Sequence, residues 1–528
     1  MSWSPPRRFT FAEELSERAS ALGDKVFLSF DDDTLTFADA ERGATAAANQ
    51  LLALGLEPGD TIALFAGSGP EWVVTWLGAA RAGIRTMPVN LAFRGDYLVH
   101  QLRDAGARAI LTDAALVPRL GEVAPGLPEL RTALVLGEPE EKVDGIDFLP
   151  AADYLAAGDT DTVHGGRALA WNEPATIFST SGTTGPSKGA LLSQHYLCAT
   201  ADALCERYDS TVDDVMYAAL PLFHVSGAQG IVLGSLVSGR TSVLDRAFHP
   251  STCWDRVRAV GATQFFGVGA MIMMLWALPP RPDDATLPFH LMISAPVPAE
   301  LHRPLEERYG CRVVVGYGLS EAMLIASHRV DEPIVPGTVG RPSDLYEVRL
   351  VDDEDGDVPV GTPGEIVVRP RFPHVMFESY VGRPAETLAQ FRNLWFHTGD
   401  LARVDEEGYF YFVDRKDDYL RRRGENISSF EVERSVLAHP AVGECAAHAV
   451  ASALSEDDVK ICVVVKPGEG LTAEGLWEHC AVRMPRFAVP RYIEFVDALP
   501  KNVVGRVQKH LLRDRGVTPA TWDREAPA

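Results

Sequence analysis

The chain has 528 residues, of which 46% are hydrophobic and 23% are charged, and its formal net charge is −24. This ordinary globular composition excludes a disordered chain and fits about three or four domains, or one large multi-layer body with a small partner domain. The acidic balance argues against binding to nucleic acid or to anionic membranes, and no stretch approaches the ~20 apolar residues of a membrane span.

The 7 cysteines are odd in number and are never spaced as Cys-x-x-Cys. Such a pattern is typical of reduced thiols rather than of a disulfide framework or a zinc site. The first residues, MSWSPPRRFTFAEEL, lack the apolar run of a signal peptide. We therefore expect a cytoplasmic protein.

The first predicted elements alternate between helix and strand. Residues 37–54 place apolar side chains at helical spacing and end at Gly55. The run TIALFA then predicts a buried strand, and EWVVTWLGAARAG predicts a helix that ends at Gly83. The alternation continues to about residue 330, which predicts parallel sheet layers.

From about residue 337 short strands alternate with tight turns, as in YEVRLVDDEDGDVP, GTPGEIVVRP and GYFYFVDR. This pattern predicts an antiparallel, barrel-like part. We interpret the acidic run Asp352–Asp357 as a solvated hairpin tip, with a metal site as the less favoured alternative. After Asp414 a charged stretch precedes a helix, strands around residues 445–465, and a last helix from about residue 471.

The predicted fold class is therefore α/β with two domains. Residues 1–414 form a large, multi-layer N-terminal domain that combines parallel α/β sheets with the antiparallel barrel-like part. Residues 415–528 form a small α+β domain at the C-terminus. The boundary is placed at the charged stretch because domain linkers are usually polar and exposed.

Residues 177–189 read IFSTSGTTGPSKG, so an apolar strand runs into a loop of serine, threonine and glycine that ends at Lys188. Glycines let backbone N–H groups approach an oxyanion, while the hydroxyls and the lysine add donors and positive charge. The spacing is not that of a Walker A loop. We predict that Ser179–Gly189 holds a phosphate, rather than being a flexible surface loop, and that the chain is an enzyme that uses a nucleotide.

The segment STSGTTGPSKG resembles the phosphate loop of the adenylate-forming superfamily, which includes acyl-CoA ligases, amino-acid-adenylating domains and firefly-type luciferases. Its other motifs follow in order over essentially the whole chain. They are PLFHVSG (221–227), SAPVP (294–298), VVVGYGLSEA (313–322), WFHTGD (395–400) and DRKDDYLRRRGENISSFEVE (414–433). The resemblance implies AMP or ATP, bound as an acyl-adenylate, together with CoA and Mg²⁺.

The resemblance also implies the residues that contact these groups. The implied nucleotide and CoA contacts are Thr180, Ser181, Gly182, Thr183, Thr184, Lys188, Ser294, Ala295, Pro296, Tyr317, Gly318, Ser320, Asp400, Arg415, Arg421, Arg422, Arg423 and Gly424. The implied metal ligands are Thr184 and Glu321, and the implied catalytic residues are His224, Glu321, Asp417 and Arg506. Ser294 and Asp414 stand where glycine is more common in the family.

Each role has a plainer alternative. His224 lies between two apolar residues and would by itself more often be a core histidine. Tyr317, implied to stack on adenine, has strand-end packing as its alternative, and Glu321 has a helix N-terminal charge. Asp400, implied to accept hydrogen bonds from both ribose hydroxyls, could instead cap a turn. The cluster Arg421–Arg423, implied to contact CoA phosphates, could equally be a solvated face.

The hinge motif and the last motif bear on the two half-reactions of the family. Asp417 matches the pivot about which the small domain rotates, and Gly424 matches the loop that reaches the thiol tunnel after rotation. The last motif usually ends in a lysine that bridges the carboxylate and the nucleotide during adenylation. Arg506 occupies that position, whereas Lys501 and Lys509 are out of register. Because arginine is longer and planar, we predict that adenylation is weak or lost and thioester formation retained.

The acyl pocket is expected, by analogy, to be lined by small residues, namely Gly227, Ala228, Val268, Gly269, Ala270 and Ala322, with adaptable methionines nearby. Gly269 stands where many relatives have proline. We predict a bulky, largely apolar carboxylic acid, and no acid is evident that would hold an amine. The alternative is that the small residues merely permit close packing.

The leading hypothesis is an acyl-CoA ligase or its thioester-forming half, which takes a carboxylic acid or its acyl-adenylate together with CoA. Other hypotheses are an ordinary two-step ATP-dependent synthetase, an enzyme that loads a carrier protein, a luciferase-like oxygenase, and a nucleotide-binding pseudoenzyme. The identity of the acid, a separate adenylating partner enzyme and a homodimer are left open.

Overall fold

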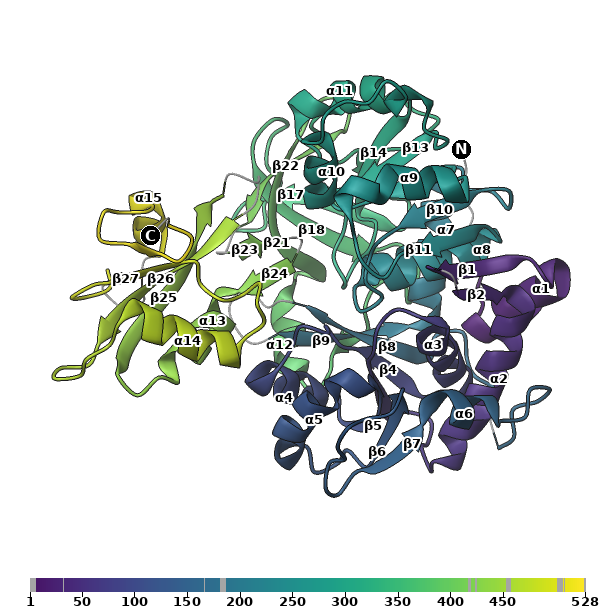
Figure 1. The fold of residues 1–528 in the computed structure, drawn as a ribbon. Helices are drawn as coiled ribbons and strands as arrows, with labels where there is room; N and C mark the ends of the chain where they lie inside the picture. Colours follow the sequence, from purple (N-terminus) through teal and green to yellow (C-terminus); the bar gives the residue numbers. More distant parts are fainter. Residues whose placement is uncertain are drawn as a thin grey trace.

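The computed structural model describes residues 6–31, 33–165, 167–180, 187–415, 419–422, 425–452, 457–500, 507 and 509–526. Figure 1 shows a large body of stacked sheets and helices, with a smaller unit beside it at the C-terminal end of the chain. This confirms the predicted α/β class with a large N-terminal and a small C-terminal domain. The boundary at residue 414 stays a prediction, because residues 416–418 lie outside the described part.

The first large sheet is mainly parallel, and only its edge strands run antiparallel. In order across the sheet the strands are β16 (Arg341–Pro342), β15 (Ala326–Ser327), β14 (Arg312–Tyr317), β13 (Leu291–Ser294), β12 (Gln264–Phe266), β10 (Val215–Ala218), β11 (Thr241–Leu244), β1 (Val26–Phe30) and β2 (Asp33–Thr36). The parallel strands from β14 to β1 agree with the predicted parallel layers.

The second large sheet has the same construction. Its strands are β19 (Ser379–Tyr380), β9 (Lys188–Ser193), β8 (Pro174–Thr180), β4 (Arg85–Pro88), β3 (Thr61–Phe65), β5 (Ala107–Asp113), β6 (Thr132–Leu136) and β7 (Asp147–Pro150). Neighbours from β8 to β7 are parallel, whereas β9 and β19 are antiparallel. Strand β8 therefore lies inside this sheet, and the predicted phosphate loop begins at its carboxyl end.

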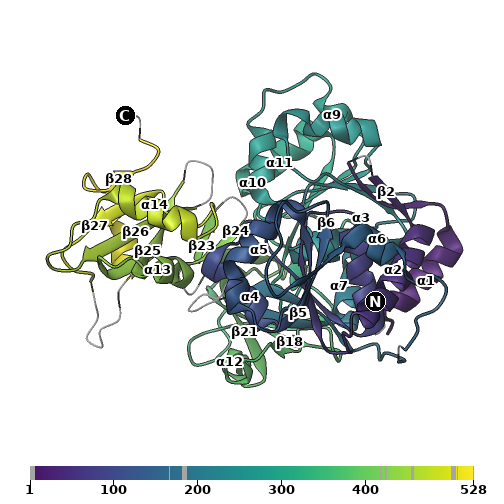
Figure 2. The same cartoon turned by 60° about the horizontal axis from the view of Figure 1, so that its bottom comes forward.

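Helices lie over both sheets (Figures 1 and 2). Those of the large domain are α1 (Phe11–Leu22), α2 (Phe37–Ala53), α3 (Pro70–Ala82), α4 (Gly95–Asp104), α5 (Val117–Val123), α6 (Ala151–Ala156), α7 (Gln194–Arg207), α8 (Gly234–Ser238), α9 (Pro250–Val260), α10 (Gly269–Trp276), α11 (Ala299–Tyr309) and α12 (Pro384–Gln390), with a π-helix, η3 (Ser226–Leu233), before α8. The predicted helix over 37–54 is α2, and the one ending at Gly83 is α3, whose C-cap is Gly83 in the left-handed conformation. No helix among the described residues is long and apolar enough to cross a membrane.

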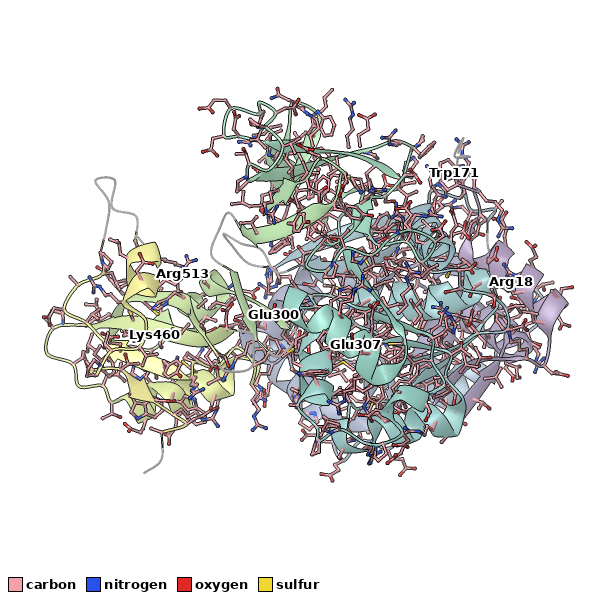
Figure 3. The ribbon with its side chains drawn as sticks, turned by 90° about the horizontal axis from the view of Figure 1, so that it is seen from above. Arg18, Trp171, Glu300, Glu307, Lys460 and Arg513 are labelled. Carbon is pink, nitrogen blue, oxygen red and sulfur yellow. The ribbon has the colours of Figure 1, made fainter. Side chains whose placement is uncertain are left out.

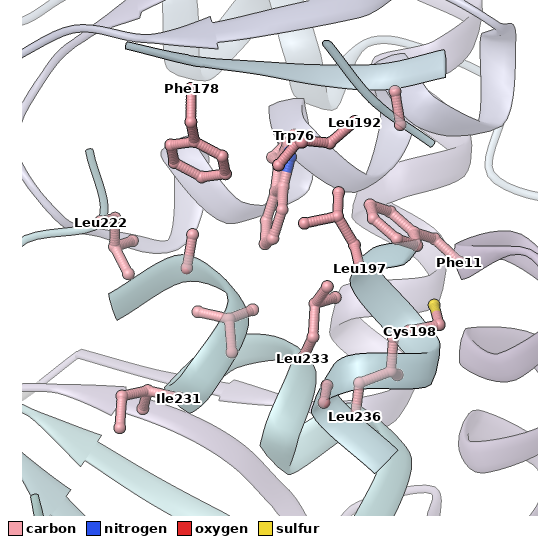
Figure 4. Close-up of a cluster of buried hydrophobic side chains, with 14 of the residues drawn as sticks. Phe11, Trp76, Phe178, Leu192, Leu197, Cys198, Leu222, Ile231, Leu233 and Leu236 are labelled. Atoms are coloured by element: carbon pink, nitrogen blue, oxygen red, sulfur yellow. The ribbon is translucent and has the colours of Figure 1, made fainter. Parts of the chain in front are cut away.

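The main core lies between the two large sheets, and Figure 4 shows part of it. Trp76 from α3 and Phe178 from β8 face Leu197 of α7 and Leu233 of η3 in this cluster. The one polar group of Trp76 is paired, because its indole N–H donates to Thr176 Oγ1 at 2.8 Å. Segments far apart in sequence therefore share one apolar centre, which holds the two sheets in a fixed relation.

An antiparallel sheet follows from residue 346 onward, as predicted. Its strands are β17 (Tyr346–Val351), β18 (Gly364–Pro370), β21 (Trp395–Val404), β20 (Phe391–Arg392) and β22 (Phe410–Arg415). The acidic run Asp352–Asp357 lies between β17 and β18 and is mostly exposed, which confirms the hairpin tip. The described residues contain no group of three or more acidic, histidine or cysteine side chains that could hold a metal ion.

The small domain, described from residue 419 onward, is an α+β unit. Its elements are β23 (Tyr419–Arg422), β24 (Glu425–Ser428), α13 (Ser429–Leu437), β25 (Val442–Ala451), β26 (Asp457–Val465), α14 (Ala473–Arg483), β27 (Tyr492–Phe495), α15 (Lys509–Arg515) and β28 (Trp522–Asp523). The helix predicted from about residue 471 is α14, but β27, α15 and β28 were not predicted. Lys460 (Figure 3) is buried in this domain, where it pairs with Glu494 and donates to the Gly516 carbonyl oxygen at 2.6 Å.

Two buried histidines of the large domain give the fold a predictable sensitivity to acid. The pKa of His195 is lowered to about 4, mainly by burial and in smaller part by the positive charge of Arg8 and by the neighbouring His374. Burial also lowers the pKa of His328 to about 4, with His302 nearby. The unfolded chain titrates near 6.5, so between pH 6.5 and 4 it binds protons that the folded protein does not.

The stability contributed by these neutral histidines is therefore fully present above pH 6.5 and is lost as the pH falls towards 4. We expect the free energy of unfolding to fall by about 1–2 kcal/mol per histidine between pH 7 and pH 5, measured by urea denaturation. The variant His195→Gln should reduce this pH dependence. An identical urea midpoint at the two pH values in the unmodified protein would contradict the expectation.

Candidate active site

A cavity of about 880 Å³ opens where the sheets of the large domain meet the small domain. Its walls include residues at the carboxyl ends of four strands, namely Thr180 of β8, Phe266 of β12, Ser294 of β13 and Tyr317 of β14. Ligands of open α/β sheets bind at this edge, because the loops that follow the strands converge there. Glu425, Ile427 and Glu431 of the small domain also line the cavity.

Most of the predicted site residues in the described part come together here, although their roles stay predictions. Thr180, Lys188, His224, Val268, Ala270, Ser294, Ala295, Pro296, Tyr317, Gly318, Ser320, Glu321 and Asp400 all line the cavity. Ser181, Gly182, Thr183, Thr184, Asp417, Arg423, Gly424 and Arg506 lie outside the described residues. Arg415 and Arg421 lie on β22 and β23, and only their backbone belongs to the described part.

Asp400 and Tyr317 form a bonded pair on one wall. Asp400 is 1% exposed, and its Oδ2 accepts a hydrogen bond from the Tyr317 hydroxyl at 2.6 Å. The backbone places Asp400 firmly, because its amide donates to Thr398 Oγ1 at 3.1 Å. A carboxylate accepts several hydrogen bonds at once, so this group can bind a cis-diol while it still holds the phenol. The Tyr317 ring lies 6.0 Å from the ring of Phe412.

Glu321 and Lys188 share an aromatic partner that the sequence did not reveal. The hydroxyl of Tyr380 donates to Glu321 Oε1 at 2.7 Å, and the ammonium of Lys188 lies 4.8 Å from the centre of the same ring. Lys188 also pairs with Glu386 on α12, with a distance of 3.3 Å between Nζ and Oε2. Tyr380 reaches the site because the short strand β19 pairs with β9. This pairing joins segments far apart in sequence, and no motif predicts it.

His224 is held by a carboxylate of the small domain. Its Nε2 lies 3.1 Å from Oε2 of Glu425 on β24, and the side-chain amide of Asn90 donates to both oxygens of that carboxylate at 3.3 Å. His224 therefore lines the cavity rather than the core. The contact shows that, in this arrangement, the β23–β24 hairpin faces the cavity. Glu425 lies inside the hinge motif, but nothing in the sequence indicated that His224 would be its partner.

The prediction for Arg422 is wrong. Arg422 is 6% exposed, and its guanidinium donates to the Val489 carbonyl oxygen at 2.9 Å and pairs with Asp458 at 2.9 Å. Asp458 is in turn paired with Arg491 at 2.8 Å. Arg422 therefore belongs to an ion-pair network inside the small domain and offers no charge to CoA phosphates. Successive side chains of a strand such as β23 point to opposite faces of its sheet, so neighbouring arginines cannot all point towards solvent.

Four of the small residues predicted to line the acyl pocket are also misplaced. Ala228 and Ala322 are fully buried, and neither they nor Gly227 and Gly269 line the cavity. A Cβ at Gly227 would lie 2.3 Å from the Pro221 carbonyl oxygen, so these residues permit close packing. The apolar end of the cavity is lined by larger side chains, among them Leu204, Phe248, Phe266, Met271, Met274 and Leu324. Met271 and Met274 are methionines of the kind expected near the pocket, whereas Leu204, Phe248 and Leu324 were not expected.

The packing role of Gly269 gives a testable expectation. A Cβ there would lie 2.6 Å from the Pro296 carbonyl oxygen, a contact that only a backbone shift at the start of α10 can relieve. We expect Gly269→Ala to lower the free energy of unfolding by about 1–3 kcal/mol, as measured by urea denaturation. Gly470→Ala is the matched control, because nothing lies within 4 Å of a Cβ at that exposed glycine. Equal stability of the two variants would contradict the packing role.

Comparison with known proteins identifies the family. Residues 15–380 match the family model of the AMP-binding enzyme, and residues 431–506 match that of the AMP-binding enzyme C-terminal domain. The chain is 28% identical over 509 residues to the crotonobetaine/carnitine–CoA ligase of Salmonella paratyphi A (strain ATCC 9150 / SARB42). The match covers 94% of this chain and 97% of that protein.

Solved structures agree with this assignment. The anthranilate CoA ligase AuaEII in complex with anthranoyl-AMP matches with a TM-score of 0.73 and 26% identity, over 97% of this chain and 98% of that one. ATP-bound MatB from Rhodopseudomonas palustris matches with a TM-score of 0.70 and 28% identity, over 96% and 99% of the two chains. The chain belongs to the AMP-binding enzyme family, in the acyl-CoA ligase branch of the adenylate-forming superfamily.

Proposed function

We propose that this protein forms the CoA thioester of a bulky, largely apolar carboxylic acid by way of an acyl-adenylate. The observation that carries the proposal is a single cavity that joins the Asp400–Tyr317 pair and Glu321 to an apolar end, with the β23–β24 hairpin of the small domain facing it. In the second half of the reaction the CoA thiolate attacks the acyl carbonyl, a thioester forms and AMP leaves.

The nucleotide end of the cavity fits the proposal residue by residue. The buried carboxylate of Asp400 would accept the ribose hydroxyls, and Tyr317 would stack on the adenine. Thr180 and Lys188, at the two ends of the predicted phosphate loop, would contact phosphate oxygens. The bound ligands of the anthranilate ligase and of MatB, anthranoyl-AMP and ATP, support the use of an adenine nucleotide.

A magnesium ion fits the donors present. Mg²⁺ keeps several waters and is usually held by one or two carboxylates together with substrate phosphates, so Glu321 alone is a sufficient described ligand. Its carboxylate is 7% exposed and oriented by the Tyr380 hydroxyl. The ion would neutralise the negative charge of the phosphates.

The acyl end supports an apolar acid. The large apolar side chains of Leu204, Phe248, Phe266, Met271, Met274 and Leu324 line the cavity and would pack against an apolar acyl group. Methionines adapt to irregular shapes, which suits a bulky acid. The relatives are named for acids as different as anthranilate and carnitine, so the acid of this enzyme is inferred from its own wall.

We further propose that adenylation is weak or lost because Arg506 replaces the usual lysine. Arg506 itself lies outside the described residues. The nearby Lys509 does not take over in this arrangement, since its ammonium lies 2.7 Å from both Ser429 Oγ and Glu433 Oε1, within the small domain. Arginine keeps the charge but not the compact geometry, and a misplacement of about 1 Å costs on the order of 10²-fold in rate.

The test separates the two half-reactions. Acyl-CoA formation is measured from a panel of bulky apolar acids with Mg·ATP and CoA, and separately from the corresponding synthetic acyl-adenylates with CoA. We expect turnover of the adenylates and little or none of the free acids. Equally fast turnover from acid and ATP would establish an ordinary two-step synthetase. Failure of every acyl-adenylate to react would instead favour a nucleotide-binding pseudoenzyme.

A further inference from the structure

The carboxylate of Asp400 leaves strand β21 at a bulge. Strand β21 pairs with β18 at His397 and again at Leu401, but the four steps from 397 to 401 correspond to only two steps along β18, from 367 to 365. A bulge of this kind bends a strand and re-aims its side chains, and such bulges are frequent beside active sites. The conformation of residues 398–400 therefore sets the direction in which Asp400 points, and Asp400 lines the cavity.

Two residues of β18 hold this bulge. The Thr398 hydroxyl donates to the Ile366 carbonyl oxygen at 2.7 Å and accepts from the backbone N–H of Asp400 at 3.1 Å. Gly399 adopts a φ of +73°, in the left-handed region that favours glycine. Its backbone N–H donates to Oε1 of Glu365 at 3.2 Å. The two residues before Asp400 are thus both bonded to β18, and one of these bonds depends on a side chain.

Glu365 is itself held in place from its other side. It is 4% exposed, and its Oε2 lies 3.2 Å from Nδ1 of His397 and 3.6 Å from a guanidinium nitrogen of Arg392. The same guanidinium pairs with Asp355 at 2.9 Å. A buried carboxylate is stable only with partners of this kind, because an unpaired charge is poorly solvated in the protein interior. These contacts fix Oε2 and leave Oε1 directed at the Gly399 N–H.

We propose that Glu365 is a positioning residue for ribose recognition, which acts through the Gly399 N–H to hold the bulge and so directs Asp400 at the two ribose hydroxyls. Glu365 does not line the cavity, so it acts through Asp400 rather than by touching the nucleotide. Without its acceptor oxygen the bulge would relax, and Asp400 would then meet the hydroxyls at a poorer distance and angle. The inference rests on the proposed function, because it takes Asp400 to bind the ribose.

The diol preference of the site reports this role. It is the ratio of the dissociation constant for 2′,3′-dideoxy-AMP, which lacks both ribose hydroxyls, to that for AMP, each measured by calorimetry. A loosened fold would weaken the binding of both nucleotides alike, whereas a misdirected Asp400 weakens the binding of AMP only. The preference therefore separates the positioning of Asp400 from a general effect of Glu365 on the fold.

Removing the acceptor oxygen should abolish most of the diol preference. We expect Glu365→Ala to lower it at least about tenfold, with the affinity for 2′,3′-dideoxy-AMP unchanged within about threefold. Glu365→Asp keeps the buried charge but is one methylene shorter, so it cannot reach Gly399 and should lower the preference in the same way. This second variant carries the test if urea denaturation shows that Glu365→Ala is unfolded.

Restoring the acceptor oxygen should restore the preference. Glu365→Gln keeps an oxygen for the Gly399 N–H and turns its amide N–H to His397, which accepts through Nδ1 in its other tautomer. Its diol preference should lie within about threefold of that of the parent. In Asp400→Asn, by contrast, the addition of Glu365→Ala should change the preference no further, because two changes that act through one group are not additive.

Glu347→Ala is the matched control, because Glu347 lies on β17 of the same sheet, pairs with Arg369 and has a side chain that is 39% exposed. It should behave as the parent does. If the unmodified protein does not prefer AMP, or if Asp400→Asn keeps the preference, the ribose site of the proposed function fails. If Asp400→Asn loses the preference while Glu365→Ala and Glu365→Asp keep it, or weaken the binding of both nucleotides alike, the positioning role of Glu365 is refuted.

Discussion

Pyrophosphate release from Mg·ATP in the presence of the acid is expected to rise by about 10²-fold when Arg506 is replaced by lysine. Lysine presents a compact ammonium whose three donors can be directed freely, whereas guanidinium is planar and longer. A compact ammonium therefore fits between the attacking carboxylate and the nucleotide more readily than a planar guanidinium does. The rate is measured with a coupled pyrophosphate assay over the same panel of acids.

Thioester formation from synthetic acyl-adenylate should remain within about threefold in Arg506→Lys, because the changed group serves only the first half-reaction. Lys501→Arg is the matched control, since it makes the opposite exchange outside the motif register and should leave both half-reactions unaltered. A variant that gains no pyrophosphate release, or an unmodified enzyme that already releases it rapidly, would refute the role given to Arg506.

Much of the fold could be predicted from local patterns. Helices α2 and α3 are predicted by the helical spacing of their apolar residues and by a glycine at or near the C-terminal end of each. Strand β3 is predicted by an unbroken apolar run. The change to antiparallel strands after residue 337 followed from turn residues at close intervals. Elements β27, α15 and β28 were missed, because they are short and are defined by pairing with β26 and packing on β25 rather than by their own sequence.

Residues of the site could be predicted where they belong to a motif with recognisable chemistry. They could not be predicted where packing between segments far apart in sequence determines which side chains meet. Thr180 and Tyr317 end strands β8 and β14, Glu321 follows β14 and Asp400 lies within β21, and all four line the cavity. Local sequence says little about which neighbour a side chain meets, so Tyr380 beside Glu321 and Glu425 beside His224 were missed.

The glycines and alanines predicted to line the acyl pocket were misinterpreted because their surroundings are also determined by long-range packing. A glycine or alanine permits either a cavity or a close contact, and the two readings have the same sequence. Gly227 and Gly269 are needed because a backbone carbonyl approaches each of them, from the preceding turn at Gly227 and from another loop at Gly269. Arg422 was predicted to be available to a ligand but is buried. It pairs with Asp458, which lies 36 positions further along the chain, and this partner could not be inferred from the local sequence.

Affinity for AMP is expected to fall by about 10²- to 10⁴-fold when Asp400 is replaced by asparagine, since hydrogen bonds to a charged group contribute about 1.5–3 kcal/mol each. The carboxylate accepts from the Tyr317 hydroxyl at 2.6 Å and would accept from both ribose hydroxyls. An amide of the same shape offers one acceptor and two donors, so it cannot accept from the diol and from the phenol together. Calorimetry with AMP measures the loss.

The diol itself is tested with 2′,3′-dideoxy-AMP. The unmodified protein should prefer AMP strongly over this analogue, and Asp400→Asn should bind the two about equally. Tyr317→Phe is the informative comparison, because it removes the phenol donor and leaves the carboxylate free to accept both ribose hydroxyls. It should cost at most about tenfold in affinity while keeping the preference for the diol. If Asp400→Asn retains that preference, the cavity wall at Asp400 does not bind the ribose, and the nucleotide must be oriented by other residues of the cavity.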